Sequence, residues 1–308
     1  ARQLDEMGAK ITILDNLSTG TKKAIRTGEL IEGDIGNLDL LENIFSSHNF
    51  DAVMHFAGSI VVPESVTNPL LYYQNNTRNS SQLIQMCINH QVNTFIFSST
   101  AAVYGTPKEG ICHENGPLNP INPYGRSKLM TEWVLEDTAQ AHNFEYVALR
   151  YFNVAGAAHE HMLGQYNPKS THLIKIACQT ACNKRESIQV YGNDYPTPDG
   201  TCIRDYIHIE DLANAHLLAL NYLFEGGKSN IFNCGYSQGF SVKEVLETVQ
   251  KIHQKPIKII QANRRPGDPP KLIADASKIK AQLKWAPQFN DIEAIVRSAY
   301  LFEAQLKD

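Results

Sequence analysis

The sequence of 308 residues contains no uninterrupted apolar run close to the roughly 18 residues that a membrane-spanning helix requires, although 43% of its residues are hydrophobic. We therefore predict no membrane partner. Basic residues are not in excess either, because 28 lysines and arginines stand against 32 aspartates and glutamates, for a formal net charge of −4. Nucleic-acid binding requires a basic surface, so we also predict no nucleic-acid partner.

Cysteine is scarce and scattered: there are six cysteines, and none forms a Cys-x-x-Cys pair. This spacing argues against a disulfide framework or a zinc site, and we expect reduced thiols in a cytoplasmic protein. His159 and His161 stand close together in a polar stretch. We interpret them as solvated side chains and predict no metal site.

A glycine-rich phosphate loop is also missing ahead of the first predicted strand, residues 10–14. In a dinucleotide-binding fold, an acidic residue at the end of the second strand holds the adenosine ribose, about 20 residues after that loop. Asp15, followed by Asn16, has this place but lies only 15 residues into the chain. We therefore expect the sequence to be truncated, with the first strand and the phosphate loop upstream of Ala1.

What the chain does contain is a regular alternation of short apolar segments and helical segments. The predicted strands are residues 10–14, 31–35, 51–56, 95–98 and 147–151. The alternation predicts an α/β fold with a doubly wound parallel (Rossmann-like) sheet, whose site lies at the C-terminal ends of the strands.

The rhythm changes after Asn153, where a loop at residues 155–170 is followed by a predicted helix at residues 172–183. We therefore expect a first domain at residues 1–153 and a smaller C-terminal α/β lobe at residues 154–308. Some segments of the lobe are expected to return to the first domain.

The stretch with the clearest chemistry begins where an apolar strand ends in Ser-Ser-Thr at Thr100. The next helix is predicted to begin with Asn122 as its N-cap and Pro123 as its first residue. Tyr124 and Lys128 are four residues apart and so share one helix face. A free tyrosine, with a pKa near ~10, is a poor base, but a neighbouring ammonium favours the phenolate. The pattern predicts a general base that takes a proton from an alcohol, to which Thr100 also hydrogen-bonds.

Three further motifs accompany this set. They are Phe56-Ala57-Gly58, Arg204-Asp205-Tyr206-Ile207-His208 followed by Asp211-Leu212-Ala213, and Arg264-Arg265-Pro266-Gly267-Asp268. On these residues the chain resembles the extended short-chain dehydrogenase/reductase family and, within it, is similar to the UDP-glucose 4-epimerases along nearly its whole length. The resemblance implies a bound NAD and the interconversion of UDP-galactose and UDP-glucose through a transient 4-keto sugar.

The resemblance also implies which residues bind the cofactor and the substrate. The cofactor residues are Asp15, Asn16, Asp34, Ile35, Phe56, Ala57, Gly58, Asn76, Tyr124, Lys128 and Tyr151. The substrate residues are Thr100, Tyr124, Asn153, Leu173, Tyr191, Arg204, Arg265, Asp268 and Leu272. Tyr124, Lys128 and Thr100 are the implied catalytic residues. Arginines suit the diphosphate, because their planar guanidinium groups make paired, charge-assisted contacts.

Enzymes of the same superfamily catalyse several related reactions. A 4,6-dehydratase of the same superfamily carries an Asp-Glu pair after the threonine, whereas this chain has Ala101-Ala102. In the resembled family a large residue at the place of Leu272 favours plain hexoses, so we expect UDP-glucose and UDP-galactose. Epimerases of UDP-N-acetylhexosamines or UDP-uronates stay as alternatives, and a non-catalytic nucleotide-sugar or NAD sensor is a second one. Family members commonly dimerise through the helix that carries Tyr124, and we expect a homodimer.

Overall fold

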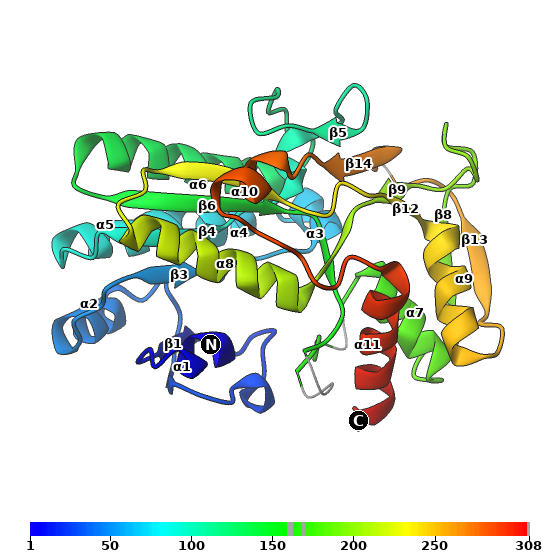
Figure 1. Ribbon diagram of the computed structural model, residues 1–308, viewed down its shortest axis with the longest axis horizontal. Coiled ribbons are helices and arrows are strands. Elements are labelled where there is room, and N and C mark those ends of the chain that lie inside the picture. Colours follow the sequence, from blue (N-terminus) through cyan, green and yellow to red (C-terminus); the bar gives the residue numbers. More distant parts are fainter. Residues whose placement is uncertain (159–162, 168–169, 266, 307–308) are drawn as a thin grey trace. The chain divides into compact units, whose positions relative to one another are not determined.

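The computed structural model describes residues 1–158, 163–167, 170–265 and 267–306 (Figure 1). The chain divides into two compact units. Unit 1 comprises residues 1–105, 118–150 and 214–232, and unit 2 comprises residues 106–117, 151–213 and 233–308. The expected doubly wound α/β class is confirmed by parallel strands that alternate with helices.

Most strands of unit 1 are parallel and are connected through helices. Its strands are β1 (Thr12–Asp15), β2 (Glu29–Glu32), β3 (Val53–His55), β4 (Thr94–Ser98), β6 (Glu145–Tyr151) and β11 (Asn230–Cys234). β1 pairs with β2 in a two-stranded sheet, and the others form a four-stranded sheet in the order β11-β6-β4-β3. β3, β4 and β6 run parallel, so that their C-terminal ends lie at one edge.

Helices cover this sheet. The helical segments of unit 1 are α1 (Arg2–Glu6), η1 (Lys22–Ala24), α2 (Leu38–Ser47), α3 (Val62–Thr67), α4 (Pro69–Tyr72), η2 (Tyr73–Arg78), α5 (Asn79–Asn89), η3 (Ala101–Tyr104), α6 (Pro123–Ala141) and most of α8 (Ile209–Phe224). Figure 1 shows β6 between α6 and α8. The core joins α2 and α5 to β4 and β6 through buried side chains such as Leu41, Cys87, Phe95 and Ala148. This core holds β4 and α6, the two elements that carry the predicted catalytic residues.

Unit 2 is built from shorter sheets. Its strands are β5 (Ile111–Cys112), β7 (Asn153–Ala155), β8 (Ile188–Tyr191), β9 (Ile203–Arg204), β10 (Tyr206–His208), β12 (Phe240–Ser241), β13 (Ile259–Ala262) and β14 (Lys271–Ala274). Its helices are α7 (Leu173–Ala181), α9 (Val242–His253), α10 (Ser277–Gln282) and α11 (Ile292–Gln305). The sheets have the strand orders β12-β9-β14-β5, β10-β7 and β13-β8.

Two expectations about local structure were wrong. The predicted strand at residues 31–35 lies earlier, at Glu29–Glu32, where it pairs in register with β1. Ala155, predicted to begin a loop, is instead the last residue of β7, which pairs with β10. His159 and His161 lie outside the described residues.

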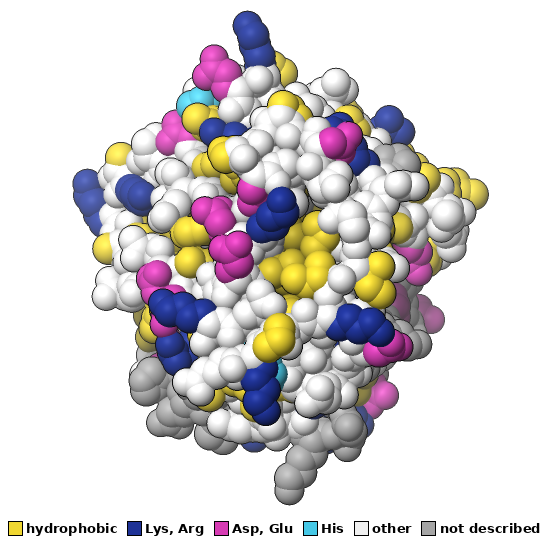
Figure 2. Space-filling view, turned by 90° about the vertical axis from the view of Figure 1, so that its right-hand side faces the viewer, with side chains coloured by type: hydrophobic (Ala, Val, Ile, Leu, Met, Phe, Trp, Pro, Cys, Tyr) yellow, Lys and Arg dark blue, Asp and Glu magenta, His cyan; other side chains and the backbone are white. Residues whose placement is uncertain are grey.

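The surface charges agree with the mixed composition. On the face drawn in Figure 2, lysines and arginines are interspersed with aspartates and glutamates. Within the described ranges, no three or more histidines, cysteines or acidic residues gather as metal ligands would. The described helices include none with the length and hydrophobicity needed to cross a membrane.

Candidate active site

Helix α6 begins as its sequence predicts. The Asn122 side chain accepts a hydrogen bond from the backbone nitrogen of Gly125 at 2.9 Å, and Pro123 occupies the first turn. This cap fixes the start of the helix one residue before Tyr124. Tyr124 is therefore partly exposed at the helix start, and Lys128 is buried one turn later.

The C-terminal end of β4 meets this helix. The Lys128 ammonium donates to the carbonyl oxygen of Ser98 at 2.9 Å. The Thr100 hydroxyl accepts from the backbone nitrogen of Ala102 at 3.1 Å, and it lies near enough to Tyr124 to influence the pKa of that phenol. The structure thus brings together the three predicted catalytic residues, Thr100, Tyr124 and Lys128, within unit 1.

The electrostatics of this site act on both titrating groups. Burial lowers the pKa of Lys128 to about 8, and the negative charge of Glu132 opposes that shift. Burial raises the pKa of Tyr124, and the neighbouring Thr100 hydroxyl acts in the opposite direction. In the chain alone, therefore, Tyr124 is not yet the tuned base that the sequence predicts. An additional positive charge near the phenolate would be needed to lower its pKa.

The acidic residues predicted to bind the adenosine half gather at the ends of β1 and β2. The Asn16 side-chain amide donates to the Asp34 carboxylate at 2.7 Å, and the other Asp34 oxygen accepts from the backbone nitrogen of Gly36 at 2.7 Å. Asp15 ends β1 and accepts from the backbone nitrogen of Leu17 at 2.7 Å. Ile35 is buried beside Asp34. This end of the two strands presents carboxylate oxygens, which suit ribose hydroxyls.

The predicted cofactor residues Phe56, Ala57 and Gly58 follow β3 and form an accessible edge. The Phe56 ring is 55% exposed, and Ala57 is exposed next to it. At Gly58 an added Cβ would lie 3.0 Å from the Asn76 side-chain oxygen and 3.4 Å from the Lys128 nitrogen. Only glycine leaves this space clear, so a ligand can approach the backbone beside Lys128.

Asn76 ties this edge to the catalytic helix. It lies in the π-helical segment η2, a kind of segment often found at functional sites. Its side-chain oxygen accepts from the Ser59 backbone nitrogen at 2.7 Å, and its amide donates to the Ser127 hydroxyl at 3.0 Å. Asn76 is buried, and these partners occupy its amide group. The structure therefore indicates that Asn76 positions the loop after β3 beside α6.

These residues fit the two ends of a dinucleotide. The carboxylates at the ends of β1 and β2 suit the adenosine ribose, and the clear edge at Gly58 beside Lys128 suits the nicotinamide riboside. Both groups lie in unit 1. Tyr151, the remaining predicted cofactor residue, lies in unit 2 at the end of β6.

Four predicted substrate residues form one cluster in unit 2. The Asp268 carboxylate accepts from the Arg265 Nε at 2.9 Å and lies 3.7 Å from the Arg204 Nη2. The Arg265 guanidinium lies over the Tyr191 ring, 4.7 Å from its centroid. Two cations, one carboxylate and one aromatic face are thus assembled, as a nucleoside diphosphate would require.

The other predicted substrate residues of unit 2 occupy defined places. Leu272 lies on β14 directly opposite Arg204 on β9, and it is partly buried. Asn153 begins β7, where its backbone nitrogen donates to the Asp205 carbonyl at 3.0 Å. Leu173 is the first residue of α7. The latter two are not among the side chains of the Asp268 cluster.

Sequence reasoning missed a buried charged pair behind the catalytic residues. Glu132, one turn after Lys128 on α6, pairs with Arg150 at the end of β6. The signals were present in the sequence: an arginine interrupts an otherwise apolar strand, and a glutamate follows Lys128 at helical spacing. Neither signal alone shows that the two side chains meet.

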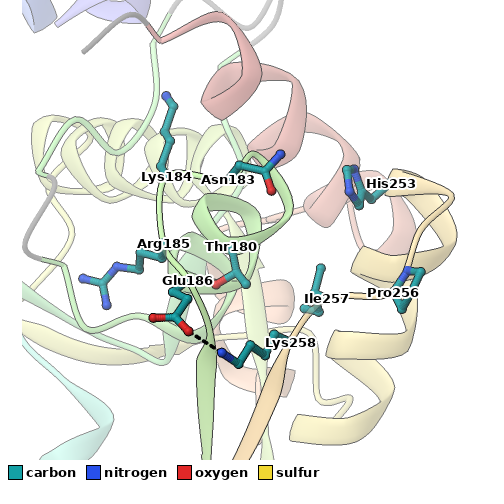
Figure 3. A pocket seen from close by; sticks show the side chains of 9 residues that line it. All are labelled: Thr180, Asn183, Lys184, Arg185, Glu186, His253, Pro256, Ile257 and Lys258. Carbon is teal, nitrogen blue, oxygen red and sulfur yellow. Dashed lines mark hydrogen bonds and ion pairs between the residues drawn. The ribbon is translucent and has the colours of Figure 1, made fainter.

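A surface pocket of about 520 Å³ opens elsewhere in unit 2 (Figure 3). Its lining residues are Thr180, Asn183, Lys184, Arg185, Glu186, His253, Pro256, Ile257 and Lys258. None of them is a predicted site residue. Figure 3 shows Glu186 paired with Lys258, while Lys184 and Arg185 point in different directions. Because its cations do not converge, this pocket lacks the arrangement of the Asp268 cluster.

The chain is similar along most of its length to proteins of known family. A sequence model of the NAD dependent epimerase/dehydratase family matches residues 1–235. The UDP-glucose 4-epimerase of Azospirillum brasilense is 50% identical over 305 residues, which cover 99% of this chain and 88% of the relative. The structure of UDP-glucose 4-epimerase from Brucella ovis in complex with NAD superposes with a TM-score of 0.95 at 40% identity, covering 99% and 94% of the two chains. That of the UDP-Glc/GlcNAc 4-epimerase from Campylobacter jejuni has a TM-score of 0.85 at 49% identity, with coverages of 99% and 94%.

Proposed function

Because the chain belongs to the NAD dependent epimerase/dehydratase family, we propose that it interconverts UDP-galactose and UDP-glucose as an NAD-dependent 4-epimerase. The observation that carries the proposal is the set of Thr100, Tyr124 and Lys128 at the junction of β4 and α6. A binding protein has no need of a tyrosine placed beside a buried lysine, whereas a reaction that removes a proton from a sugar hydroxyl does.

Tyr124 is the proposed general base. It takes the proton from the 4-hydroxyl of the sugar and returns it after the 4-keto sugar has turned over. Bound NAD supplies the hydride acceptor and donor, and its positively charged ring favours the phenolate form of Tyr124. Thr100 lies near Tyr124 and is the proposed residue that orients the same 4-oxygen.

Lys128 keeps a positive charge beside the phenolate. Its ammonium is anchored on the Ser98 carbonyl and borders the clear edge at Gly58, where the nicotinamide ribose would lie. Asp15 and Asn16 are the proposed partners of the adenosine ribose, and Asp34 and Ile35 would flank the adenine.

The Asp268 cluster is the proposed site for the UDP half of the substrate. Arg204 and Arg265 would neutralise the diphosphate, and Tyr191 offers an aromatic face to the uracil. The contact between Arg265 and Asp268 can give way when a ribose hydroxyl and a phosphate compete for these groups. Asn153 and Leu173 are proposed as further substrate contacts.

The test is the conversion of UDP-galactose to UDP-glucose by the purified parent protein and by Tyr124→Phe. We expect turnover in the parent without net production of NADH, and a loss of roughly 10²–10⁴-fold in kcat for the variant. Turnover at the parent rate in Tyr124→Phe would refute the role of Tyr124. A parent that binds the nucleotide sugar without converting it would favour a sensor.

The choice of sugar rests on Leu272. Its half-buried side chain lies opposite Arg204, and we propose that it limits the room for an N-acetyl group. The relative from Campylobacter jejuni carries both UDP-Glc and GlcNAc in its name, so N-acetylated sugars form the second candidate substrate class. Rates on UDP-galactose and UDP-N-acetylgalactosamine distinguish the two, and equal rates would show that Leu272 is no gate.

A homodimer is proposed from an exposed apolar surface around α6. Trp133 on α6 is 54% exposed and Leu70 on α4 is 76% exposed, and α3 and α4 both pack against α6. Exposed apolar side chains on neighbouring helices are typical of protein interfaces. Trp133→Glu should therefore shift the sedimentation of the protein from dimer to monomer, while Phe224→Glu, on α8, should leave it unchanged. A parent that sediments as a monomer would refute the dimer.

A cytoplasmic location is also proposed. All six cysteines are free, and five of them are buried. Free thiols are typical of proteins in a reducing compartment. Fractionation of the source cells, with immunodetection of the protein, tests the location.

A further inference from the structure

Glu132 and Arg150 form an ion pair in the interior of unit 1. Arg150 Nη2 lies 2.6 Å from one carboxylate oxygen of Glu132, and Arg150 Nε lies 3.0 Å from the other. Both side chains are 2% exposed. A buried pair of this kind is weak evidence for stability, because the loss of hydration offsets the attraction. Its place therefore calls for another explanation.

The pair lies directly behind the catalytic residues. The Ser99 hydroxyl donates to Glu132 at 2.5 Å, and Arg150 also donates to the Tyr104 hydroxyl at 3.0 Å. Two side chains of α6, four residues apart, thus contact consecutive residues at the end of β4. Lys128 donates to the Ser98 carbonyl and Glu132 accepts from the Ser99 hydroxyl, while Tyr124, four residues before Lys128, lies near Thr100.

The charges around Lys128 are few. Glu132 faces it from its own helix, and Arg150 compensates that carboxylate from β6. From β3, the buried ring of His55 lies near enough to Lys128 for its charge to lower the pKa of the imidazole. From β4, the aromatic ring of Phe97 lies 4.9 Å from the Lys128 nitrogen. Glu132 is therefore the carboxylate whose charge raises the pKa of Lys128, and Arg150 is its ion-pair partner.

We propose that the Glu132–Arg150 pair holds Lys128 in place and balances its charge, so that Glu132 is a positioning residue that acts on Tyr124 through Lys128. The inference rests on the proposed epimerase reaction. It explains why two charges are retained inside unit 1 at a place where neither is exposed to solvent.

The test is the pH dependence of kcat in two variants with opposite charge changes. Activity should rise with the ionisation of Tyr124 and fall with the deprotonation of Lys128. Glu132→Gln leaves Arg150 uncompensated, so both limbs of the profile should move to lower pH by roughly one unit. Arg150→Gln leaves Glu132 uncompensated, so both limbs should move to higher pH. Equal losses at every pH, with unmoved limbs, would overturn the proposal.

Three further variants separate charge from folding. In the double variant Glu132→Gln with Arg150→Gln, the limbs should return to the parent positions. Arg150→Lys keeps the charge and should leave the limbs unmoved. Ser99→Ala keeps the ion pair but removes its link to β4, so kcat should fall about tenfold with an unchanged KM. An unchanged kcat in Ser99→Ala would contradict the positioning role, even if the single charge variants do not fold.

A spectroscopic readout keeps this inference distinct from the proposed function. The ultraviolet absorbance of tyrosinate, recorded against pH and corrected with Tyr124→Phe, reports the ionisation of Tyr124 without turnover. Glu132→Gln should move this titration to lower pH, even if the parent fails to convert UDP-galactose. If the parent fails to convert UDP-galactose but the tyrosinate titration moves, the proposed epimerase reaction is refuted and the role of the Glu132–Arg150 pair is supported. If the parent converts UDP-galactose but the titration does not move in Glu132→Gln, the proposed role of the Glu132–Arg150 pair is refuted.

Discussion

The Asn16 side-chain amide donates a hydrogen bond of 2.7 Å to the Asp34 carboxylate, and this contact joins the ends of two parallel strands. Asp15, the last residue of β1, lies beside it in sequence. The contact orients one Asp34 oxygen, while the other is held by the backbone nitrogen of Gly36. The Asp34 carboxylate is thus held by two contacts within the chain.

Asp34→Ala should weaken NAD binding roughly 10–150-fold, because a hydrogen bond to a charged group contributes roughly 1.5–3 kcal/mol. Calorimetric titration of the purified protein with NAD measures this change. Asp39→Ala, an exposed acidic residue of α2, is the matched control and should keep the parent affinity. Equal affinities in the parent and Asp34→Ala would show that this carboxylate does not contact the cofactor.

Two variants of Thr100 should distinguish a catalytic role of its hydroxyl from a role of its side chain in packing. Thr100→Val keeps the shape but loses the hydroxyl beside Tyr124 and the cap of η3, so kcat should fall by roughly 10–100-fold. Thr100→Ser keeps the hydroxyl and should stay within a few-fold of the parent. Steady-state rates on UDP-galactose provide the measurement. A Thr100→Val enzyme as active as Thr100→Ser would remove the hydroxyl from the mechanism.

The adjacent arginines at positions 264 and 265 offer a matched pair for the UDP site. Arg265 pairs with Asp268 over Tyr191, whereas Arg264 pairs with Asp194. Arg265→Ala should raise KM for UDP-galactose about 10–100-fold, because a charge-assisted contact to the diphosphate is lost. Arg264→Ala should leave KM within a few-fold of the parent. The reverse order of effects would place the diphosphate on the other side of this loop.

Local signals explain why the catalytic helix could be predicted from the sequence. Asn122, Pro123 and the spacing of Tyr124 and Lys128 act within one or two turns, and the structure has the cap and first turn where they were expected. The strand predicted at residues 31–35 was misplaced because its position does not depend on local signals. Its bounds depend on pairing with β1, a contact between residues 17 positions apart, and apolar pattern alone does not determine that register.

The remaining features depend on contacts between distant segments. Residues 106–117 join unit 2 through the pairing of β5 with β14, and nothing in their local sequence indicates this. The Glu132–Arg150 pair likewise forms only when α6 packs against β6. The sequence placed Asn76 near the cofactor by resemblance, but only the structure shows that its amide group is occupied by Ser59 and Ser127.

His55 provides a prediction about stability. Its ring is 3% exposed, and burial, together with the charge of Lys128, lowers its pKa to about 3. The Ser80 hydroxyl donates to the Asn76 carbonyl, so the His55 ring donates from Nε2 to the Ser80 oxygen at 2.7 Å and is neutral. Below the ordinary histidine pKa near ~6.5, the unfolded chain binds a proton that the folded chain does not. The free energy of unfolding should therefore lose about 1.4 kcal/mol per pH unit from this group as the pH falls from about 6.5 towards 3, with no such loss above that range.

His55→Gln isolates this contribution, because other titrating groups are common to both proteins and cancel in the difference. Glutamine can keep one hydrogen bond to Ser80 but cannot take up a proton in this range. Above pH 7 the parent should be the more stable protein by a constant amount, since a buried contact is weakened in the variant. Between pH 6 and pH 5 that advantage should shrink by about 1.4 kcal/mol, because the unfolded parent binds a proton at His55 that the folded parent does not bind. Urea unfolding of both proteins at pH 5, 6 and 7 measures the difference. Stability curves that stay parallel across this range would mean that His55 is protonated inside the folded chain, and its ring would then place a second positive charge beside Lys128.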